Sequence, residues 1–285
     1  MSKVNLIYTG SNGREFNLMA EDIRLRAGSF FRAKWKPDTN KKQFGVSISR
    51  WTKEPLQYEM ELIFSGSVEE RKQMLTSFWS STETDILTGI PGVLTYQNAY
   101  LEGFFIESDT EPTENQRWTA HTVIFYAPVP FWVTEQKIIV NPLSDDSSSL
   151  SYKTYDGGYS YDTGYHYPGA ASDVVVNTGH YTESDFRIAV YGPTSNVAIT
   201  MAGNLYQVNH AVGAGEIMII DSRQSQPIDR KCYLIGSGGT ITNIFNSRIG
   251  TLFNKLPGGE WQIVYTREYS IELTIYKRRS VPFWS

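Results

Sequence analysis

The sequence contains a single cysteine, Cys232, among 285 residues. One thiol cannot form a disulfide within the chain or build a multi-cysteine zinc site. Histidine is also scarce, and His121, His166, His180 and His210 have no partner His or Cys at ligand spacing. We therefore expect no metal site, no disulfide framework and no cofactor.

Long apolar runs are missing as well. The longest, Val123–Val133, has eleven residues and is interrupted by Pro128 and Pro130. It covers about half of the ~20 residues that a membrane-spanning helix needs. The first twenty residues lack the apolar core of a signal peptide. These absences predict no membrane span and synthesis in the cytoplasm.

Motifs of the common enzyme classes are absent. The chain has no phosphate-binding loop of the Gly-x-x-x-x-Gly-Lys type, no His-Glu-x-x-His and no Gly-x-Ser-x-Gly. Asp145, Asp146, Asp156 and Asp162 lack the regular spacing of a calcium loop. The sequence thus predicts a protein that is not an enzyme. A glycan-degrading enzyme stays as an alternative, because its two carboxylates would converge only in three dimensions.

Positive charge is in deficit over the whole chain, with 26 Lys and Arg against 30 Asp and Glu. Sequence-wide binding of nucleic acid is therefore not expected, since it needs a basic excess. The segment Arg24–Lys53 is the exception, because Asp38 is its only acid. It is interpreted either as a docking surface for an acidic partner or neighbouring subunit, or as a solvated, mobile loop. The candidate docking residues are Arg24, Arg26, Arg32, Lys34, Lys36, Lys41 and Lys42.

What the sequence does contain is a mostly β pattern rich in aromatic residues, which make up 14% of the chain. From Tyr58 to Phe64, apolar residues alternate with polar ones, so one strand face is expected to be buried. The same alternation recurs in the second half, where Gly203-Asn204 predicts a hairpin turn.

One helix is predicted, from the capping box of Ser67 and Glu70 to about Ser81. His121 shares a predicted strand face with Val123 and Phe125, so we expect it to pack in a core or a subunit interface.

Residues 144–170 differ abruptly in composition, being dominated by Ser, Tyr, Gly and Asp. No aliphatic core could be built from them. The domains are therefore predicted as 1–138 and 139–285, with 144–170 as a strap on the second. The alternative is a Tyr-rich binding surface. Candidate saccharide or partner contacts are Tyr155, Tyr159, Tyr161 and Trp261.

Six segments form an ordered set along the chain: Phe44–Trp51, Ala127–Val133, Tyr191–Val208, Gly215–Arg223, Phe253–Tyr265 and Tyr276–Trp284. This set resembles the siphovirus tail-component family, and within it the distal tail proteins of long non-contractile phage tails. The chain departs from the family pattern at Val197, where Pro is frequent, and at Trp261, where Asn is frequent.

This resemblance implies an N-terminal β-sandwich or split-barrel ring domain with one α-helix, followed by a C-terminal galectin-like β-sandwich. It further implies a hexameric ring at the virion tail tip. The ring would join the major tail-tube protein to a tip protein or fibre and to a receptor-binding protein, around a channel for the tape-measure protein and the DNA. The DNA would pass without specific binding, and no membrane partner is implied.

A second function remains open at this point. A galectin-like sandwich could recognise a host cell-wall saccharide, with Trp261 as a stacking platform. Fold alone does not establish sugar binding.

Overall fold

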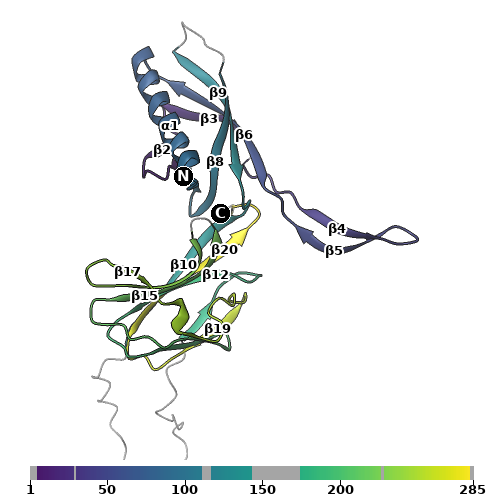
Figure 1. The fold of residues 1–285 in the computed structure, drawn as a ribbon. Coiled ribbons are helices and arrows are strands. Elements are labelled where there is room, and N and C mark those ends of the chain that lie inside the picture. The colour runs from purple at the N-terminus through teal and green to yellow at the C-terminus, as the bar shows by residue number, and fades with distance from the viewer. Residues whose placement is uncertain (1–4, 29, 111–116, 143–173, 226–227, 283–285) are drawn as a thin grey trace, which may run out of the picture. The chain divides into compact units, whose positions relative to one another are not determined.

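The computed structural model describes residues 5–28, 30–110, 117–142, 174–225 and 228–282, and it is mostly β (Figure 1). The chain divides into two compact units. Unit 1 comprises Met1–Glu135, Ser225–Pro227 and Arg278–Ser285, and unit 2 comprises Gln136–Gln224 and Ile228–Lys277. Within the described residues, α1 (Val68–Thr88) is the one α-helix, and no helix is long and apolar enough to cross a membrane.

Unit 1 is built around a strand that belongs to two sheets. Strand β8 pairs with β7 up to Gly103 and with β9 from Phe104 onward. A Cβ at Gly103 would lie 2.4 Å from the carbonyl oxygen of Tyr126, so only glycine fits where the strand changes partners. One sheet has the order β2-β1-β7-β8-β10 and the other β3-β6-β9-β8. The strands are β1 (Leu6–Thr9), β2 (Glu15–Asn17), β3 (Ile23–Gly28), β6 (Leu56–Ser65), β7 (Gly92–Tyr96), β8 (Ala99–Thr110), β9 (Trp118–Ala127) and β10 (Trp132–Val140). From Gln136 on, β10 belongs to unit 2.

The core of unit 1 is aromatic and is closed by α1. The alternation predicted along β6 is confirmed, because Tyr58, Met60, Leu62 and Phe64 are all buried. Phe78 of α1 is also buried, and its ring packs on several aromatic rings of the sheets. Its ring partners are Tyr8, Phe16, Phe64 and Phe105.

The helix begins as predicted and ends later than predicted. Both hydrogen bonds of the capping box between Ser67 and Glu70 are present. The helix continues to Thr88, beyond the predicted end near Ser81, and stops at Gly89 in the left-handed conformation. The last turns of the helix carry polar residues, and one of them, Asp85, is buried. Its carboxylate accepts hydrogen bonds from the Tyr8 hydroxyl and, at 2.6 Å, from the Ser11 amide.

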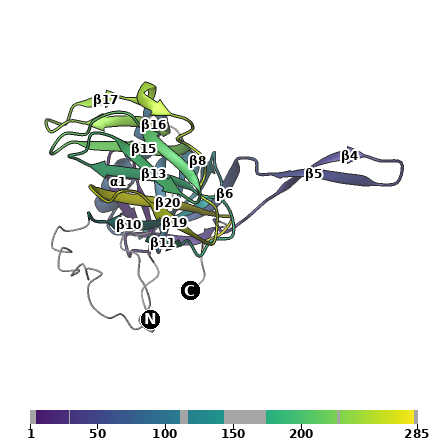
Figure 2. The same ribbon diagram turned by 90° about the horizontal axis from the view of Figure 1, so that it is seen from below.

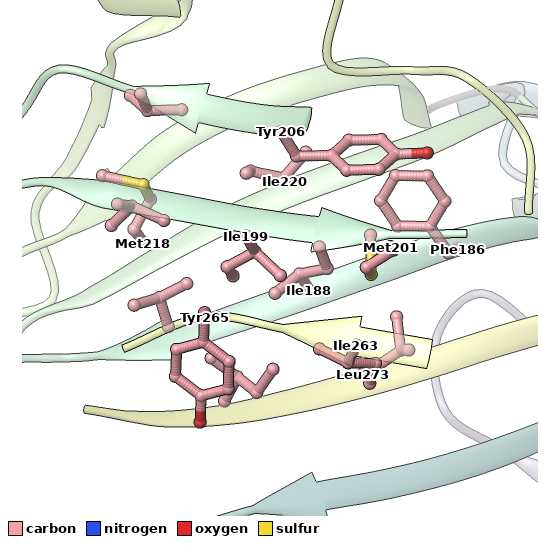
Figure 3. Packing of buried hydrophobic residues seen from close by; sticks show 14 of the residues in the cluster. Phe186, Ile188, Ile199, Met201, Tyr206, Met218, Ile220, Ile263, Tyr265 and Leu273 are labelled. Carbon is pink, nitrogen blue, oxygen red and sulfur yellow. The ribbon is translucent and has the colours of Figure 1, made fainter. Parts of the chain in front are cut away.

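Unit 2 is a β-sandwich. One sheet has the order β17-β16-β15-β12-β20 and the other β11-β19-β13-β14-β18. Figure 3 shows side chains of β12 and β20, such as Ile188 and Leu273, packed with those of β13 and β19, such as Ile199 and Ile263. The strands are β11 (Val174–Asn177), β12 (Asp185–Tyr191), β13 (Val197–Met201), β14 (Asn204–Val208), β15 (Ile217–Ser225), β16 (Ile228–Ile235), β17 (Ile241–Asn243), β18 (Arg248–Ile249), β19 (Glu260–Val264) and β20 (Ser270–Arg279).

The hairpin of β13 and β14 turns one residue earlier than predicted. Met201 pairs with Asn204, so the turn consists of Ala202 and Gly203, both with positive φ. The prediction of Gly203-Asn204 was wrong by one position because Ala202 adopts a left-handed conformation that its sequence does not signal.

Candidate functional site: an exposed basic arm in unit 1

Two strands of unit 1 form a sheet of their own. Strand β4 (Lys36–Lys41) and strand β5 (Val46–Thr52) pair only with each other, from Lys36 opposite Thr52 to Lys41 opposite Val46. We call this hairpin, residues 36–52, the arm. Figures 1 and 2 both show it extending away from the sheets of unit 1. Its side chains are exposed or half-buried throughout, so the arm has no buried face.

Large apolar side chains are exposed on the arm. Phe44 in the turn is 89% exposed, and Ile48 in β5 is 50% exposed. Val46 and Trp51 are exposed as well. Exposed apolar residues that gather on one element, rather than lying singly, are typical of a surface that binds another protein.

The predicted docking residues are divided among three places. Arg24 and Arg26 lie on β3, and Arg32 and Lys34 lie on the connection from β3 to β4. Only the remainder belong to the arm or its turn. The arm is a two-stranded sheet, in contrast to the loop of the alternative interpretation. Those on the arm are Lys36, Lys41 and Lys42.

Some of these cations already have acidic partners. Arg26 is 3.0 Å from Glu61, and Lys36 contacts Glu54. Glu54 raises the pKa of Lys36, and Lys36 lowers the pKa of Glu54, through their hydrogen bond and their opposite charges. These pairs are exposed and contribute little to stability. The structure gives no ion pair within its described residues to the other predicted cations, Arg24, Arg32, Lys34, Lys41 and Lys42.

Lys53 holds the arm where it joins the rest of unit 1. Its Nζ donates a 2.9 Å hydrogen bond to the carbonyl oxygen of Pro130 and lies 4.2 Å from the ring centre of Phe131 and 5.1 Å from that of Trp35. Burial lowers the pKa of Lys53 to about 8. Because Trp35 precedes β4 and Lys53 follows β5, one cation–π cluster fixes both ends of the arm.

A recess of about 270 Å³ lies beside this cluster. Leu56 and Tyr126 contribute apolar surface to it, and Arg32 and Lys34 bring positive charge. Lys36 also lines the recess, together with its acidic partner Glu54. The base of the arm is thus suited to an acidic group on a partner.

The open face of the sheet β3-β6-β9-β8 has the opposite charge. Across the register, Glu59 of β6 and Glu107 of β8 both lie beside Ile124 of β9. One step along, Glu61 and Asp109 both lie beside Thr122 in the same way. Directly opposed residues share a face, so the four carboxylates lie on one face of the sheet and make it acidic over β6 and β8. Glu61 already pairs there with Arg26 of β3.

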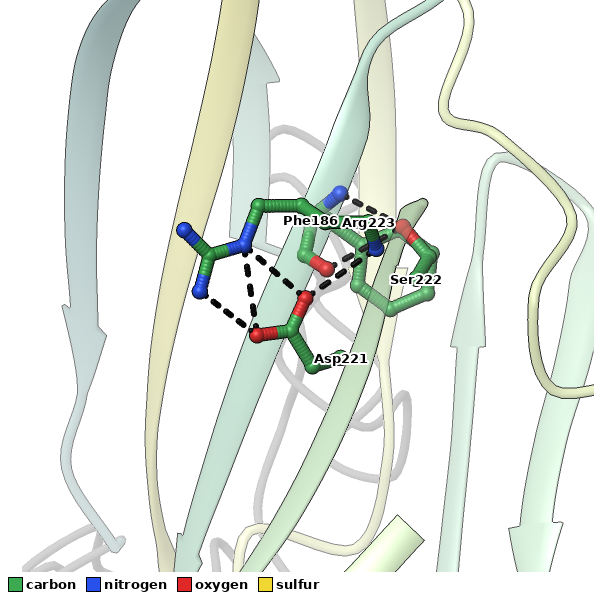
Figure 4. Close-up of polar contacts among 4 residues, drawn as sticks. All are labelled: Phe186, Asp221, Ser222 and Arg223. Carbon is green, nitrogen blue, oxygen red and sulfur yellow. Dashed lines mark hydrogen bonds and ion pairs between the residues drawn. The ribbon is translucent and has the colours of Figure 1, made fainter. Parts of the chain in front are cut away.

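In unit 2, the ion pair of Arg223 and Asp221 belongs to a set of polar contacts that link strands (Figure 4). Arg223 donates hydrogen bonds to both carboxylate oxygens of Asp221, the shortest of them 2.7 Å, and its guanidinium lies 4.3 Å from the ring centre of Tyr276. Next to it, the Ser222 hydroxyl accepts from the Phe186 amide at 2.8 Å and donates to the Phe186 carbonyl at 3.1 Å. This pattern links β15 to β12 and β20.

The aromatic contacts predicted for unit 2 are not assembled into a surface. Trp261 is only 7% exposed and belongs to the core, because it stands on β19 opposite Val176 with its ring facing inward. Its expected role as a stacking platform was wrong. Tyr155, Tyr159 and Tyr161, together with the predicted strap 144–170, lie outside the described residues.

Two other expectations concern histidine and metal. His121 is buried, as predicted, with its ring 5.2 Å from that of Phe64, and burial lowers its pKa. Across the residues that the structure describes, no group of three or more His, Cys, Asp or Glu side chains is arranged to hold a metal ion.

The fold and the arm define a class of protein: a two-unit β protein whose first unit carries an exposed basic arm and an acidic sheet face. No family model matches the chain, and no curated protein matches it by sequence. Solved structures do match, over nearly the whole chain.

One is the Dit (gp 19.1) protein of SPP1, described as a paradigm of the hub adsorption apparatus in phages that infect Gram-positive bacteria. Its TM-score is 0.59 at 9% identity, covering 96% of this chain and 99% of that one. A chain of the phage P2 baseplate, in its activated conformation with calcium, matches with a TM-score of 0.66 at 16% identity, covering 99% of this chain and 100% of that one. The baseplate with strontium gives 0.64 at 16% identity, over 98% and 99%. The resemblance predicted from the sequence is thus confirmed for the fold.

Proposed function

We propose that this protein is a structural hub of a phage tail tip, and that it acts by assembly rather than catalysis. The arm is the observation that carries the proposal. A two-stranded sheet that exposes Phe44, Val46, Ile48 and Trp51 leaves apolar area in water that a partner would cover. The fold shared with a hub protein and a baseplate chain indicates which kind of assembly this is.

The proposed assembly is a ring of six copies. A closed ring needs a heterologous interface, in which one surface of each subunit meets a different surface of the next. Unit 1 offers such a pair of unlike surfaces, because the arm is basic and apolar whereas the rest of the unit supplies acidic and apolar patches. The cations without acidic partners, such as Lys41 and Lys42, would favour one orientation of the neighbour.

The acidic face of unit 1 is proposed to line the channel of the ring. Glu59, Glu107 and Asp109 would repel the phosphates of passing DNA, so the DNA would slide without binding. The remaining proposed partners are the major tail-tube protein, a tip protein or fibre, the tape-measure protein and a receptor-binding protein. The protein would reside at the tail tip of the virion after synthesis in the host cytoplasm.

Electron microscopy of purified protein tests the ring. We expect particles with sixfold symmetry and an axial hole. The variant Ile48→Ser on the arm should reduce the fraction of rings strongly, because it removes apolar area from the interface. Ile249→Ser is the matched control, since Ile249 has a similar exposure, 46% against 50%, but lies on β18 of unit 2.

Two results would contradict the proposal. One is wild-type protein that shows no rings at any concentration, alone or with its tail-tube partner. The other is an equal loss of rings in both variants, which would assign no special role to the arm.

A further inference from the structure

The end of helix α1 presents the most exposed apolar side chain of unit 1 outside the arm, among the described residues. Leu87 is 86% exposed, and Ile86 and Ile90 beside it are exposed as well. The three lie within residues 86–90, around the helix end at Gly89. We call them the helix-end patch. Such clustering distinguishes the patch from single exposed residues, which need no explanation.

The electrostatics of the helix-end patch favour a cation. The last carbonyls of a helix have no partner within the helix and carry partial negative charge. A lysine or arginine in the last turn usually offsets this charge, but the last turn of α1 contains no basic residue. One turn earlier, Glu83 is exposed and adds a full negative charge. The carbonyls of Thr84, Asp85 and Ile86 accept hydrogen bonds from Thr88 and Gly89. The patch therefore combines apolar area with a helix end whose negative charge no basic residue of its last turn offsets.

The tip of the arm has the complementary chemistry. Lys41 ends β4, Lys42 follows it, and Phe44 projects from the turn as the most exposed large apolar side chain described. The turn is closed by a 3.0 Å hydrogen bond from the Lys42 amide to the Gly45 carbonyl, with Gly45 at φ 85°. A defined turn thus presents one aromatic ring beside two cations.

We propose that the arm tip of one copy docks on the helix-end patch of a second copy. Phe44 would cover Leu87, while Lys41 and Lys42 would lie near Glu83 and the last carbonyls of α1. The proposal rests on the ring proposed above and identifies its contacting surfaces. Within one chain the two surfaces do not meet, because the arm pairs only with itself and Figure 1 shows it directed away from α1.

The occupant is a second copy rather than an unrelated protein because both halves of the contact are present on one chain. Their apolar surfaces are both uncovered and their charges are opposite. The tip and the patch are also different surfaces, so the contact repeats from copy to copy and closes a ring if the rotation permits.

Crosslinking between two different single-cysteine variants tests the contact. Gln43→Cys and Thr88→Cys, at exposed residues next to Phe44 and Leu87, leave both contact side chains in place. The two variants are purified separately, mixed, and treated with a short bismaleimide. The native Cys232 gives little background, since it is buried and burial raises its pKa to about 11. We expect a crosslinked dimer in the mixture and much less in either variant alone.

Val68→Cys is the matched control. Val68 is also exposed on α1, but it begins the helix, about 28 Å from Leu87 along the axis. A mixture of Gln43→Cys and Val68→Cys should give at least about tenfold less crosslinked dimer than the mixture with Thr88→Cys. Equal yields with Val68→Cys and Thr88→Cys would overturn the docking.

The mass of each mixture, measured by light scattering, separates the two proposals. Rings that form without the crosslink would overturn the docking alone and leave the hub proposal standing. Failure of both rings and crosslink would overturn both. As a second variant, Leu87→Ser should weaken assembly about tenfold by removing apolar area from the contact. Leu205→Ser, at an exposed leucine of unit 2, should leave assembly unchanged.

Discussion

Two hairpins of this chain differ in their surroundings. In the hairpin of β13 and β14, alternate residues such as Val197, Ile199 and Tyr206 are buried in the sandwich of unit 2. In the arm, Val46 and Ile48 alternate with serines in the same way, yet both faces remain in water. The same binary pattern therefore builds a core where a second layer is available and an exposed apolar surface where it is not. The difference teaches that apolar alternation predicts a face to be covered, and does not say which chain covers it.

The largest expected effect separates core from arm by stability. Ile199→Ala should lower the free energy of unfolding by about 2–5 kcal/mol, because it leaves a cavity in a fully buried site. Ile48→Ala on the arm should change it by less than about 0.5 kcal/mol, because that side chain is already solvated. Chemical denaturation of the two variants measures both values. A large loss of stability in Ile48→Ala would show that the arm is part of a core after all.

A second variant addresses Gly103, where β8 changes its pairing from β7 to β9. Gly103→Ala should destabilise the protein by about 1–3 kcal/mol, because its methyl group would overlap the Tyr126 carbonyl and the Phe125 ring. Gly238→Ala is the control, since nothing lies within 4 Å of its Cβ position. Thermal unfolding compares the two, and similar melting temperatures would contradict the described packing at β8.

The capping box of α1 should have a smaller effect. Ser67→Ala removes the side-chain acceptor for the Glu70 amide and should cost about 1 kcal/mol. Ser80→Ala replaces an exposed serine in the helix interior, where alanine is favoured, and should cost nothing. If the account of the helix-end patch holds, Ser67→Ala should also leave ring assembly intact, because it acts at the opposite end of α1.

A pH-dependent effect is expected at Lys53, where the arm meets the rest of unit 1. Its pKa is lowered from 10.5 to about 8, so the unfolded chain binds more protons than the folded one between these values. Stability attributable to Lys53 should therefore rise as the pH increases from about 8 to 10.5. The difference in melting temperature between wild type and Lys53→Met, measured at pH 7 and pH 10, isolates this term. The melting temperature of the wild type relative to that of Lys53→Met should be higher at pH 10 than at pH 7. If it is not, Lys53 is more solvated than described.

Local patterns predicted much of the fold. Alternation identified β6, β12 and β13, and the Ser67–Glu70 box identified the start of α1, because each of these signals acts over a few residues. The end of α1 was missed because Asp85 reads as a solvated acid, whereas it is buried against Tyr8 and Ser11 from the distant β1–β2 hairpin. The signal that could have placed the end was Gly89, the expected residue after a helix.

The candidate site was only partly visible in the sequence. Its basic composition was read correctly as exposed, but the apolar residues Phe44 and Ile48 were not included, since alternation normally implies burial. Lys53 counted as one more surface cation until its contacts with Trp35 and Phe131 were seen. Trp261 was predicted as a contact residue and is in the core. The prediction failed because the turn residue two positions before it, Gly259, gave no indication of which face β19 buries.

Light scattering coupled to size exclusion, at a series of protein concentrations, tests most directly whether the arm assembles copies of this chain. For the wild type we predict a mass that climbs with concentration toward six times 32.3 kDa. For a variant whose arm, residues 36–52, is replaced by a short Gly-Ser linker, we predict a monomer at every concentration. A wild type that stays at 32.3 kDa throughout, or an armless variant that still reaches the sixfold mass, would contradict the account.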